Sequence, residues 1–304
     1  MNPRVLITGG TGLLGKTLLE SVPEGIQPLA THHRLPPPKQ WLDCFAPLDL
    51  LQETQIQELV ERFKPACVIH TASIGKVDDA ERDPDPVRRV NVGGTEALLR
   101  ACKKTGAAII HISSNAVFDG SAPPYGETSA LRAINRYGQI KIEAEQAVLS
   151  SGVPHLIVRP ILMYGWPLKG GRGNVVTRWL EALEKAAPFE VADDITTMPL
   201  WVGDCARLIW QGLLKQHHGI VHAAGPDRVT LVDFAREICA IFGRSPGLIR
   251  PVPSRKLEDL APRPKDTSFS IDRMRNEFGI EPAGIRKGLT LMRELRAVPC
   301  GSCS

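Results

Sequence analysis

A serine, a tyrosine and a lysine in the middle of the sequence have types and a spacing suited to proton transfer. The run HISSNAVFDG contains Ser114, and NRYGQIKIEAE follows with Tyr137 and Lys141. Residues four apart on a helix project from one face, so Tyr137 and Lys141 are predicted to reach a common point. We expect the Lys141 ammonium to favour the phenolate and to lower the tyrosine pKa from its ordinary value of about 10. With Ser114 holding a carbonyl and a nicotinamide supplying hydride, this set predicts carbonyl reduction.

The alternative interpretation of Y-x-x-x-K is a surface tyrosine near an exposed lysine, because the pattern also occurs by chance. A second feature therefore matters, and it is the stretch LITGGTGLLGK near the start of the chain. Gly9, Gly12 and Gly15 lie between a predicted strand that ends at Thr8 and a helix that begins near Gly12. Glycines there let the backbone approach a pyrophosphate, which the positive end of the helix would bind. A tight turn without a ligand is the alternative, and the setting favours a dinucleotide.

The end of the second predicted strand indicates which dinucleotide this is. An acidic residue about twenty positions after the glycines would accept hydrogen bonds from the ribose of NAD. Here the strand runs into Thr31, His32, His33 and Arg34, without an acid. Because an arginine suits a 2′-phosphate, NADP(H) is predicted as the preferred cofactor and NAD(H) as the alternative.

The two histidines in that segment raise the question of a metal. No cluster of Cys, Asp or Glu at ligand spacing accompanies His32 and His33, so we expect no metal and interpret both as residues near the adenosine. Asp49 ends the third predicted strand, where it either bonds the adenine edge or is an ordinary turn residue.

Short aliphatic runs alternate with helical patterns along the first half of the chain, as in a parallel sheet covered on both faces. The predicted strands are RVLIT, IQPLAT, CFAPLDL, ACVIHTA, AAIIHISS, HLIVRP and, later, HGIVHAAG. The predicted helices are 12–21, 54–63, 86–105, 135–150, 175–185, 229–243 and 285–296. The fold class is therefore α/β, a doubly wound Rossmann domain with a smaller C-terminal substrate-binding lobe. We place the Rossmann domain at 1–164, with 191–225 returning to it, and most of the lobe at 165–304.

Composition limits the function classes. The 304 residues are 43% hydrophobic and 23% charged, and the net charge of +4 is spread without a basic stripe, which argues against a nucleic-acid partner. No stretch resembles a signal peptide or a membrane span, so a cytoplasmic protein without membrane association is expected. Cys300 and Cys303 form a C-x-x-C pair at the C-terminus, which we interpret as part of a frayed tail.

The quoted motifs resemble one large family over nearly the whole chain. TGGTGLLG, NVGGT at 91–95, ISS at 112–114 and YGQIK at 137–141 are similar to the patterns of the extended short-chain dehydrogenase/reductases. Within that family KVDDAE at 76–81, SSNAVFDG at 113–120 and RPKDTSFSIDRM near residue 270 resemble the dTDP-4-dehydrorhamnose reductase-like (RmlD-like) sugar-nucleotide reductases. The resemblance implies that Ser114 binds the carbonyl, Tyr137 is the general acid and Lys141 holds the nicotinamide ribose.

The expected contacts of the two ligands follow the same resemblance. The residues expected at the cofactor are Gly9, Thr11, Gly12, Leu13, Leu14, Gly15, His33, Arg34, Asp49, Leu50, Thr71, Ala72, Asn91, Tyr137 and Lys141. The residues expected at the substrate are Val77, Asn115, Ala116 and Leu162. Asn115-Ala116 replaces the Asp-Tyr usual after the hydroxyl, and Arg159-Pro160-Ile161-Leu162 replaces Arg-Thr-Ser-Trp. The catalytic set is thus retained while the pocket is altered.

The expected function is an NADP(H)-dependent reductase of a 4-keto sugar nucleotide, with a sugar-nucleotide-like substrate and a homodimer as the expected assembly. One alternative is an NAD-linked sugar-nucleotide epimerase or dehydratase. The other is a non-catalytic NADP-binding regulatory subunit that resembles the one of methionine adenosyltransferase.

Overall fold

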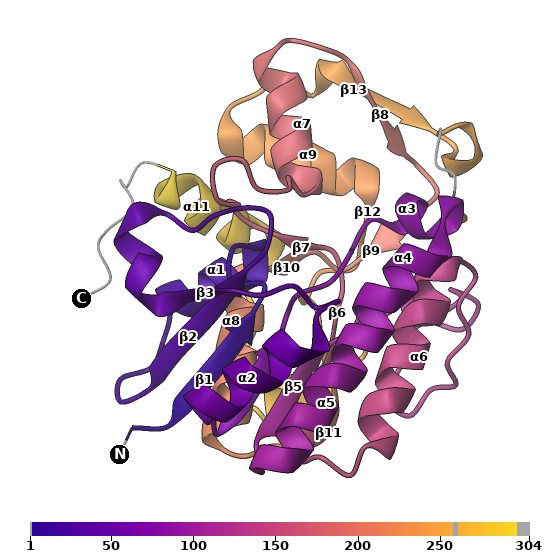
Figure 1. Cartoon of the computed structure of the whole chain (residues 1–304). Coiled ribbons are helices and arrows are strands. Elements are labelled where there is room, and N and C mark those ends of the chain that lie inside the picture. Colours follow the sequence, from indigo (N-terminus) through magenta and orange to yellow (C-terminus); the bar gives the residue numbers. More distant parts are fainter. Residues whose placement is uncertain (1, 258–260, 297–304) are drawn as a thin grey trace.

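The computed structural model describes residues 2–257 and 261–296, so the Cys300–Cys303 pair lies outside the described residues. Seven parallel strands form its central sheet in the order β11-β6-β5-β4-β1-β2-β3 (Figure 1). The strands are β1 (Arg4–Thr8), β2 (Gln27–His32), β3 (Phe45–Pro47), β4 (Cys67–His70), β5 (Ala108–Ile112), β6 (His155–Pro160) and β11 (Gly219–Ala223). All seven predicted strands are confirmed, and the fold is the predicted doubly wound α/β class.

Helices cover both faces of the sheet because alternate strand residues point to opposite sides. Ile7 packs with one apolar cluster that includes residues of two helices, α1 (Leu13–Glu20) and α8 (Val202–Leu214). Its neighbour Leu6 packs with the other cluster, under α2 (Glu53–Phe63) and α5 (Gly94–Thr105). Helix α6 (Arg136–Ser150), which carries Tyr137 and Lys141, lies beside α5 on this second face (Figure 1).

The helices differ from the predicted ones in two ways. The predicted helix 86–105 is interrupted: α4 (Pro84–Arg88) passes into a wider π-helical turn (Arg89–Gly93) before α5 begins. The predicted elements also omitted α3 (Val77–Arg82), α8 and α10 (Asp272–Asn276). Helices α3 and α10 are too short to show a helical period. Helix α8 has buried apolar residues on one face and exposed Arg207 on the other, so its pattern was detectable and was missed.

A smaller group of elements lies beyond the carboxyl ends of the strands, at the top of Figure 1. It contains α7 (Val175–Glu184), α9 (Leu231–Phe242) and the parallel pair β8 (Phe189–Ala192) and β13 (Ile249–Val252). The remaining pairs are β7 (Met163–Tyr164) with β10 (Leu200–Trp201), and β9 (Thr196–Thr197) with β12 (Val229–Thr230); the last helices are α10 (Asp272–Asn276) and α11 (Ile285–Leu295). Among the described helices none is long and apolar enough to cross a membrane.

Candidate active site

Ser114 and Tyr137 meet at the carboxyl end of β5. After this strand the chain makes a short turn in which Ser114 Oγ accepts a hydrogen bond from the Ala116 amide at 3.1 Å. Helix α6 begins directly against this turn, because a Cβ built on Gly138 would lie 2.1 Å from the Ala116 carbonyl oxygen. Only glycine permits that approach, and it brings Tyr137 close to Ser114, whose hydroxyl favours the ionised phenol and so opposes the rise of the Tyr137 pKa that burial causes.

Lys141 follows Tyr137 by one helical turn and is only 2% exposed. Its ammonium donates a hydrogen bond of 2.7 Å to the Ile112 carbonyl oxygen at the end of β5. Burial lowers the pKa of Lys141 from 10.5 to about 8, and the negative charge of Glu145 opposes this decrease. The lysine is therefore mostly protonated at neutral pH, and it loses its proton as the pH rises past about 8.

The expected effect of Lys141 on Tyr137 is wrong for the free protein. Burial raises the pKa of Tyr137, and the groups that oppose this increase are the Ser114 hydroxyl and the Arg172 guanidinium. The Lys141 ammonium is directed instead at the Ile112 carbonyl. Ser114 and Arg172 thus take the electrostatic role that the sequence analysis assigned to the lysine.

A buried ion pair joins helix α6 to the central sheet. Arg159 on β6 donates two hydrogen bonds to the Glu145 carboxylate on α6, from Nε at 2.9 Å and from Nη2 at 2.7 Å. The same carboxylate accepts a hydrogen bond from Ser113, which follows β5 and precedes Ser114. Glu145 is 0% and Arg159 1% exposed. The pair joins α6, β5 and β6 behind the catalytic groups, and sequence reasoning missed Glu145 entirely.

The glycine turn after β1 fits a pyrophosphate. Gly9 has a φ of +71°, and a Cβ built there would lie 2.8 Å from the Ala72 backbone. A Cβ on Gly15 would lie 2.3 Å from the Gly9 carbonyl oxygen, so α1 packs directly on the turn. No side chain caps the start of α1 at Gly12, and the first turn of this helix has no acidic residue. The amides of this first turn can therefore bind an anion.

His33 and Arg34 follow β2 directly and are exposed. Among the described residues Arg34 has no salt bridge, which leaves its guanidinium available for a 2′-phosphate. Asp49 lies in the turn before α2, where its carboxylate accepts a hydrogen bond from the Leu51 amide at 3.0 Å. This contact supports the turn alternative for Asp49 and leaves its second carboxylate oxygen for an adenine.

We expect Arg34→Gln to weaken NADPH binding about tenfold or more and to leave NADH binding unchanged, because one charged hydrogen-bonding partner of the 2′-phosphate is removed. Fluorescence titration of both cofactors measures this. Lys39→Gln, which removes an equal charge from the same exposed segment, is the control. Equal weakening of NADH and NADPH would show that Arg34 does not read the 2′-phosphate.

Several other residues expected at the cofactor contact the protein backbone at the edge of the sheet. The Thr71 hydroxyl donates a hydrogen bond to the Thr8 carbonyl at 2.7 Å. Asn91, in the π-helical turn, pairs with the Ile74 backbone through both ends of its amide, at 2.8 and 3.0 Å. Leu50 packs so closely on Gly94 that a Cβ there would lie 2.9 Å away. Asn91 therefore fixes the segment between β4 and α3, and direct contact of these residues with a cofactor stays a prediction.

Two of the four residues expected at the substrate lie beside Tyr137. Val77 and Ala116 pack with the small apolar cluster that contains Tyr137. Asn115 donates a hydrogen bond of 2.6 Å to the Thr267 hydroxyl and so joins the catalytic turn to the segment before α10. Leu162, after β6, has a φ of +29°, a backbone conformation that non-glycine residues rarely adopt and that recurs at functional sites.

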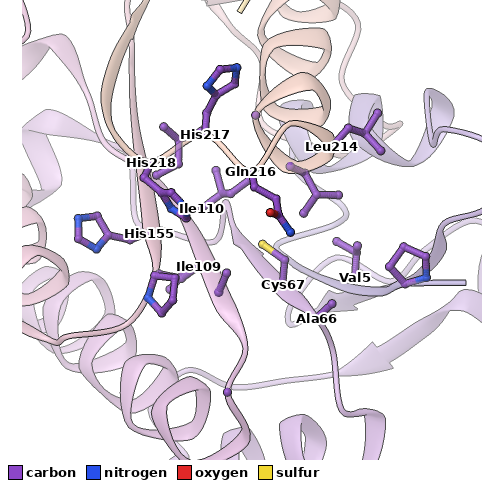
Figure 2. A pocket seen from close by; sticks show the side chains of 17 residues that line it. Val5, Ala66, Cys67, Ile109, Ile110, His155, Leu214, Gln216, His217 and His218 are labelled. Atoms are coloured by element: carbon purple, nitrogen blue, oxygen red, sulfur yellow. The ribbon is translucent and has the colours of Figure 1, made fainter. Parts of the chain in front are cut away.

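A separate cavity of about 530 Å³ lies at the opposite edge of the sheet. Figure 2 shows that Cys67, His155, His217 and His218 line it, near the amino ends of β4 and β6. Ligands of open α/β sheets bind at the carboxyl ends of the strands, so this cavity is not the catalytic site. No group of three or more His, Cys, Asp or Glu residues in the described part of the chain is arranged to hold a metal ion.

Comparisons with known proteins agree with this arrangement. The family described as RmlD substrate binding domain matches residues 3–296. A dTDP-4-keto-6-deoxy-D-glucose reductase from Streptomyces niveus is 29% identical over 93% of each chain. The methionine adenosyltransferase 2 subunit beta of Xenopus laevis is 30% identical, over 89% of this chain and 81% of its own. The crystal structure of dTDP-4-dehydrorhamnose reductase from Bacillus anthracis with NADP is 26% identical, with a TM-score of 0.86 over 97% of this chain and 100% of that one.

Proposed function

The chain belongs to the RmlD substrate-binding domain family, and on that premise we propose that it is an NADP(H)-dependent reductase of a 4-keto sugar nucleotide. The observation that carries the proposal is the close packing of α6 on the turn after β5, which places Tyr137 near Ser114 at the carboxyl edge of the sheet, with Lys141 one turn further on α6. Relatives named as sugar-nucleotide reductases, one of them solved with NADP, support the substrate class and the cofactor.

In this proposal each side chain acts on the substrate carbonyl. The Ser114 hydroxyl donates a hydrogen bond to the carbonyl oxygen and orients it toward Tyr137. Tyr137 then gives its phenolic proton to that oxygen as negative charge develops there. NADPH, when bound at the glycine turn, supplies the hydride that the carbonyl carbon accepts. Lys141 would hold the nicotinamide ribose with its ammonium, and the Arg172 guanidinium favours the anionic form of Tyr137 after proton transfer.

The pKa of Lys141 gives a pH dependence with a defined sign. Because this pKa is about 8 in the free protein, the ammonium loses its proton as the pH rises past that value. We expect NADPH affinity to be full below this pH and to decline above it, measured as a titration series across pH. Lys141→Met should bind NADPH weakly at every pH and lack the decline; the same decline in this variant would assign the titration to another group.

Two alternatives make different predictions for the isolated protein. An epimerase or dehydratase would retain oxidised NAD through purification and show no net NADPH consumption. A regulatory subunit, favoured by the similarity to methionine adenosyltransferase 2 subunit beta, would bind NADPH without turnover and associate with an enzyme. Consumption of one NADPH for each keto sugar nucleotide reduced supports the reductase and excludes both alternatives.

Four properties stay predictions from the sequence. They are the boundaries of the Rossmann domain and the substrate-binding lobe, the cytoplasmic location, the homodimeric state and the absence of a nucleic-acid partner. The substrate residues Val77, Asn115, Ala116 and Leu162 are likewise part of the proposal, which the packing of Val77 and Ala116 beside Tyr137 supports.

A further inference from the structure

The loop of residues 165–174 covers the carboxyl edge of the sheet. A Cβ built on Gly165 would lie 3.3 Å from the Leu13 side chain at the glycine turn, and one on Gly170 would lie 3.5 Å from Leu35, which follows β2. Further along, Arg172 reaches the segment after β4, because a Cβ on Gly75 would lie 3.0 Å from its Nη1 atom. The loop therefore extends from the glycine turn after β1 to the segment after β4, where the substrate is expected.

Arg172 lies on the Tyr137 side of the site, because its Nη1 atom is next to Gly75 and the neighbouring Ile74 and Val77 pack with the apolar cluster of Tyr137. Its guanidinium interacts electrostatically with the Tyr137 hydroxyl and with the Asp79 carboxylate on α3. Asp79 already has a closer partner, since Arg82 contacts it at 3.4 Å. Arg172 itself is exposed and makes no salt bridge with any residue that the structure describes. A cation beside the catalytic hydroxyl is thus available to an incoming anion.

The backbone segment next to Arg172 leaves room for its guanidinium and is held in place. Gly75 has no side chain that would displace the guanidinium, and Ile74 before it is fixed by the two hydrogen bonds of Asn91. The Arg172 loop is held as well, because Asn174 donates a hydrogen bond of 2.7 Å to the Gly165 carbonyl and the Gly171 amide donates one of 2.8 Å to the Leu168 carbonyl. The guanidinium therefore has a defined position next to Gly75.

We propose that Arg172 binds the phosphate attached to the sugar of the substrate, an inference that rests on the proposed function. In a 4-keto sugar nucleotide this phosphate is on C1 and the carbonyl is on C4, so only the width of one sugar ring separates them. With the carbonyl at Ser114 and Tyr137, a guanidinium beside Tyr137 reaches the phosphate. Arginine binds phosphate oxygens through two parallel hydrogen bonds, which also orients the sugar.

The test compares Arg172→Gln, Arg172→Lys and the control Arg178→Gln, which removes a charge from α7, the next helix. Calorimetry with thymidine diphosphate gives binding without turnover, and steady-state kinetics with a keto sugar nucleotide gives KM and kcat. For Arg172→Gln we expect a Kd for thymidine diphosphate and a KM that rise about tenfold or more. We expect kcat to fall by a smaller factor, because the guanidinium also favours the ionised form of Tyr137. Arg172→Lys should recover part of the loss, Arg178→Gln should match the wild type, and NADPH affinity should stay constant.

Two results would overturn the phosphate assignment while the reductase stands. One is unchanged thymidine diphosphate binding and KM in Arg172→Gln. The other is an unchanged KM with a reduced kcat and a shifted pH profile, which would mean that Arg172 acts on Tyr137 alone. Failure of the proposed function would look different. The wild type would then show no turnover, but it could still bind thymidine diphosphate, and Arg172→Gln would still weaken that binding. A wild type that does not bind thymidine diphosphate would overturn the assignment directly.

Discussion

Tyr137→Phe is expected to lower carbonyl reduction by about a hundredfold to ten-thousandfold, the range that loss of a positioned proton donor produces. Phenylalanine keeps the ring in the apolar cluster with Val77 and Ala116 but removes the hydroxyl that Ser114 contacts. Because the ring packing survives, NADPH affinity and thermal stability should remain close to those of the wild type. The loss should therefore fall on kcat.

The matched control is Tyr164→Phe, which removes a buried tyrosine hydroxyl that has no hydrogen-bond partner among the described residues. Steady-state NADPH oxidation with a keto sugar nucleotide, together with NADPH titration, separates chemistry from cofactor binding. Equal activity in Tyr137→Phe and Tyr164→Phe would mean that the proton comes from another group and would refute the assigned role.

Glu145→Gln is expected to lower the free energy of unfolding by about 3–5 kcal/mol, the cost typical of breaking a buried ion pair from one side. The substitution leaves the Arg159 guanidinium buried without a charge partner, although glutamine has nearly the same shape. It also removes the negative charge that raises the pKa of Lys141, so the lysine should lose its proton at a lower pH. Urea unfolding measures the stability, and the pH series for NADPH binding measures the second effect.

Glu143→Gln, on the same helix, is the control for Glu145→Gln. Glu143 pairs with Arg88 at 2.8 Å, but both side chains are exposed, so the loss should be at most about 1 kcal/mol. In the double variant Glu145→Leu with Arg159→Met, neither charge is left without a partner, and we expect recovery of much of the stability. A similar small loss for Glu145→Gln and Glu143→Gln would contradict the supporting role of the buried pair.

Local patterns in the sequence were sufficient for the scaffold. Each central strand is a short aliphatic run between polar segments, and the buried parallel sheet requires such runs at every one of its strands. The spacing of Gly9, Gly12 and Gly15 predicted the tight turn between β1 and α1, and the packing at Gly9 and Gly15 does exclude a side chain. The i, i+4 spacing likewise placed Tyr137 and Lys141 on one face of α6, since that spacing is a property of the helix itself.

The residues around the site could not be predicted from local sequence patterns, because their positions depend on contacts between distant segments. Glu145 and Arg159 are ordinary charged residues in sequence, and only the packing of α6 on the strand β6 buries them together. Arg172 lies in a loop whose conformation has no periodic signal, yet it reaches Tyr137. The direction of the Tyr137 pKa shift follows from burial and from these neighbours, so spacing alone gave the wrong effect for Lys141.

The most direct test of the reductase assignment is a turnover measurement on the purified wild-type protein. NADPH absorbance is followed with dTDP-4-keto-6-deoxy-D-glucose and related keto sugar nucleotides, and the product is quantified by chromatography. We expect substrate-dependent NADPH oxidation with one reduced sugar nucleotide formed per NADPH, and a lower rate with NADH. Tight NADPH binding without oxidation on any of these substrates would contradict the assignment and favour the regulatory alternative.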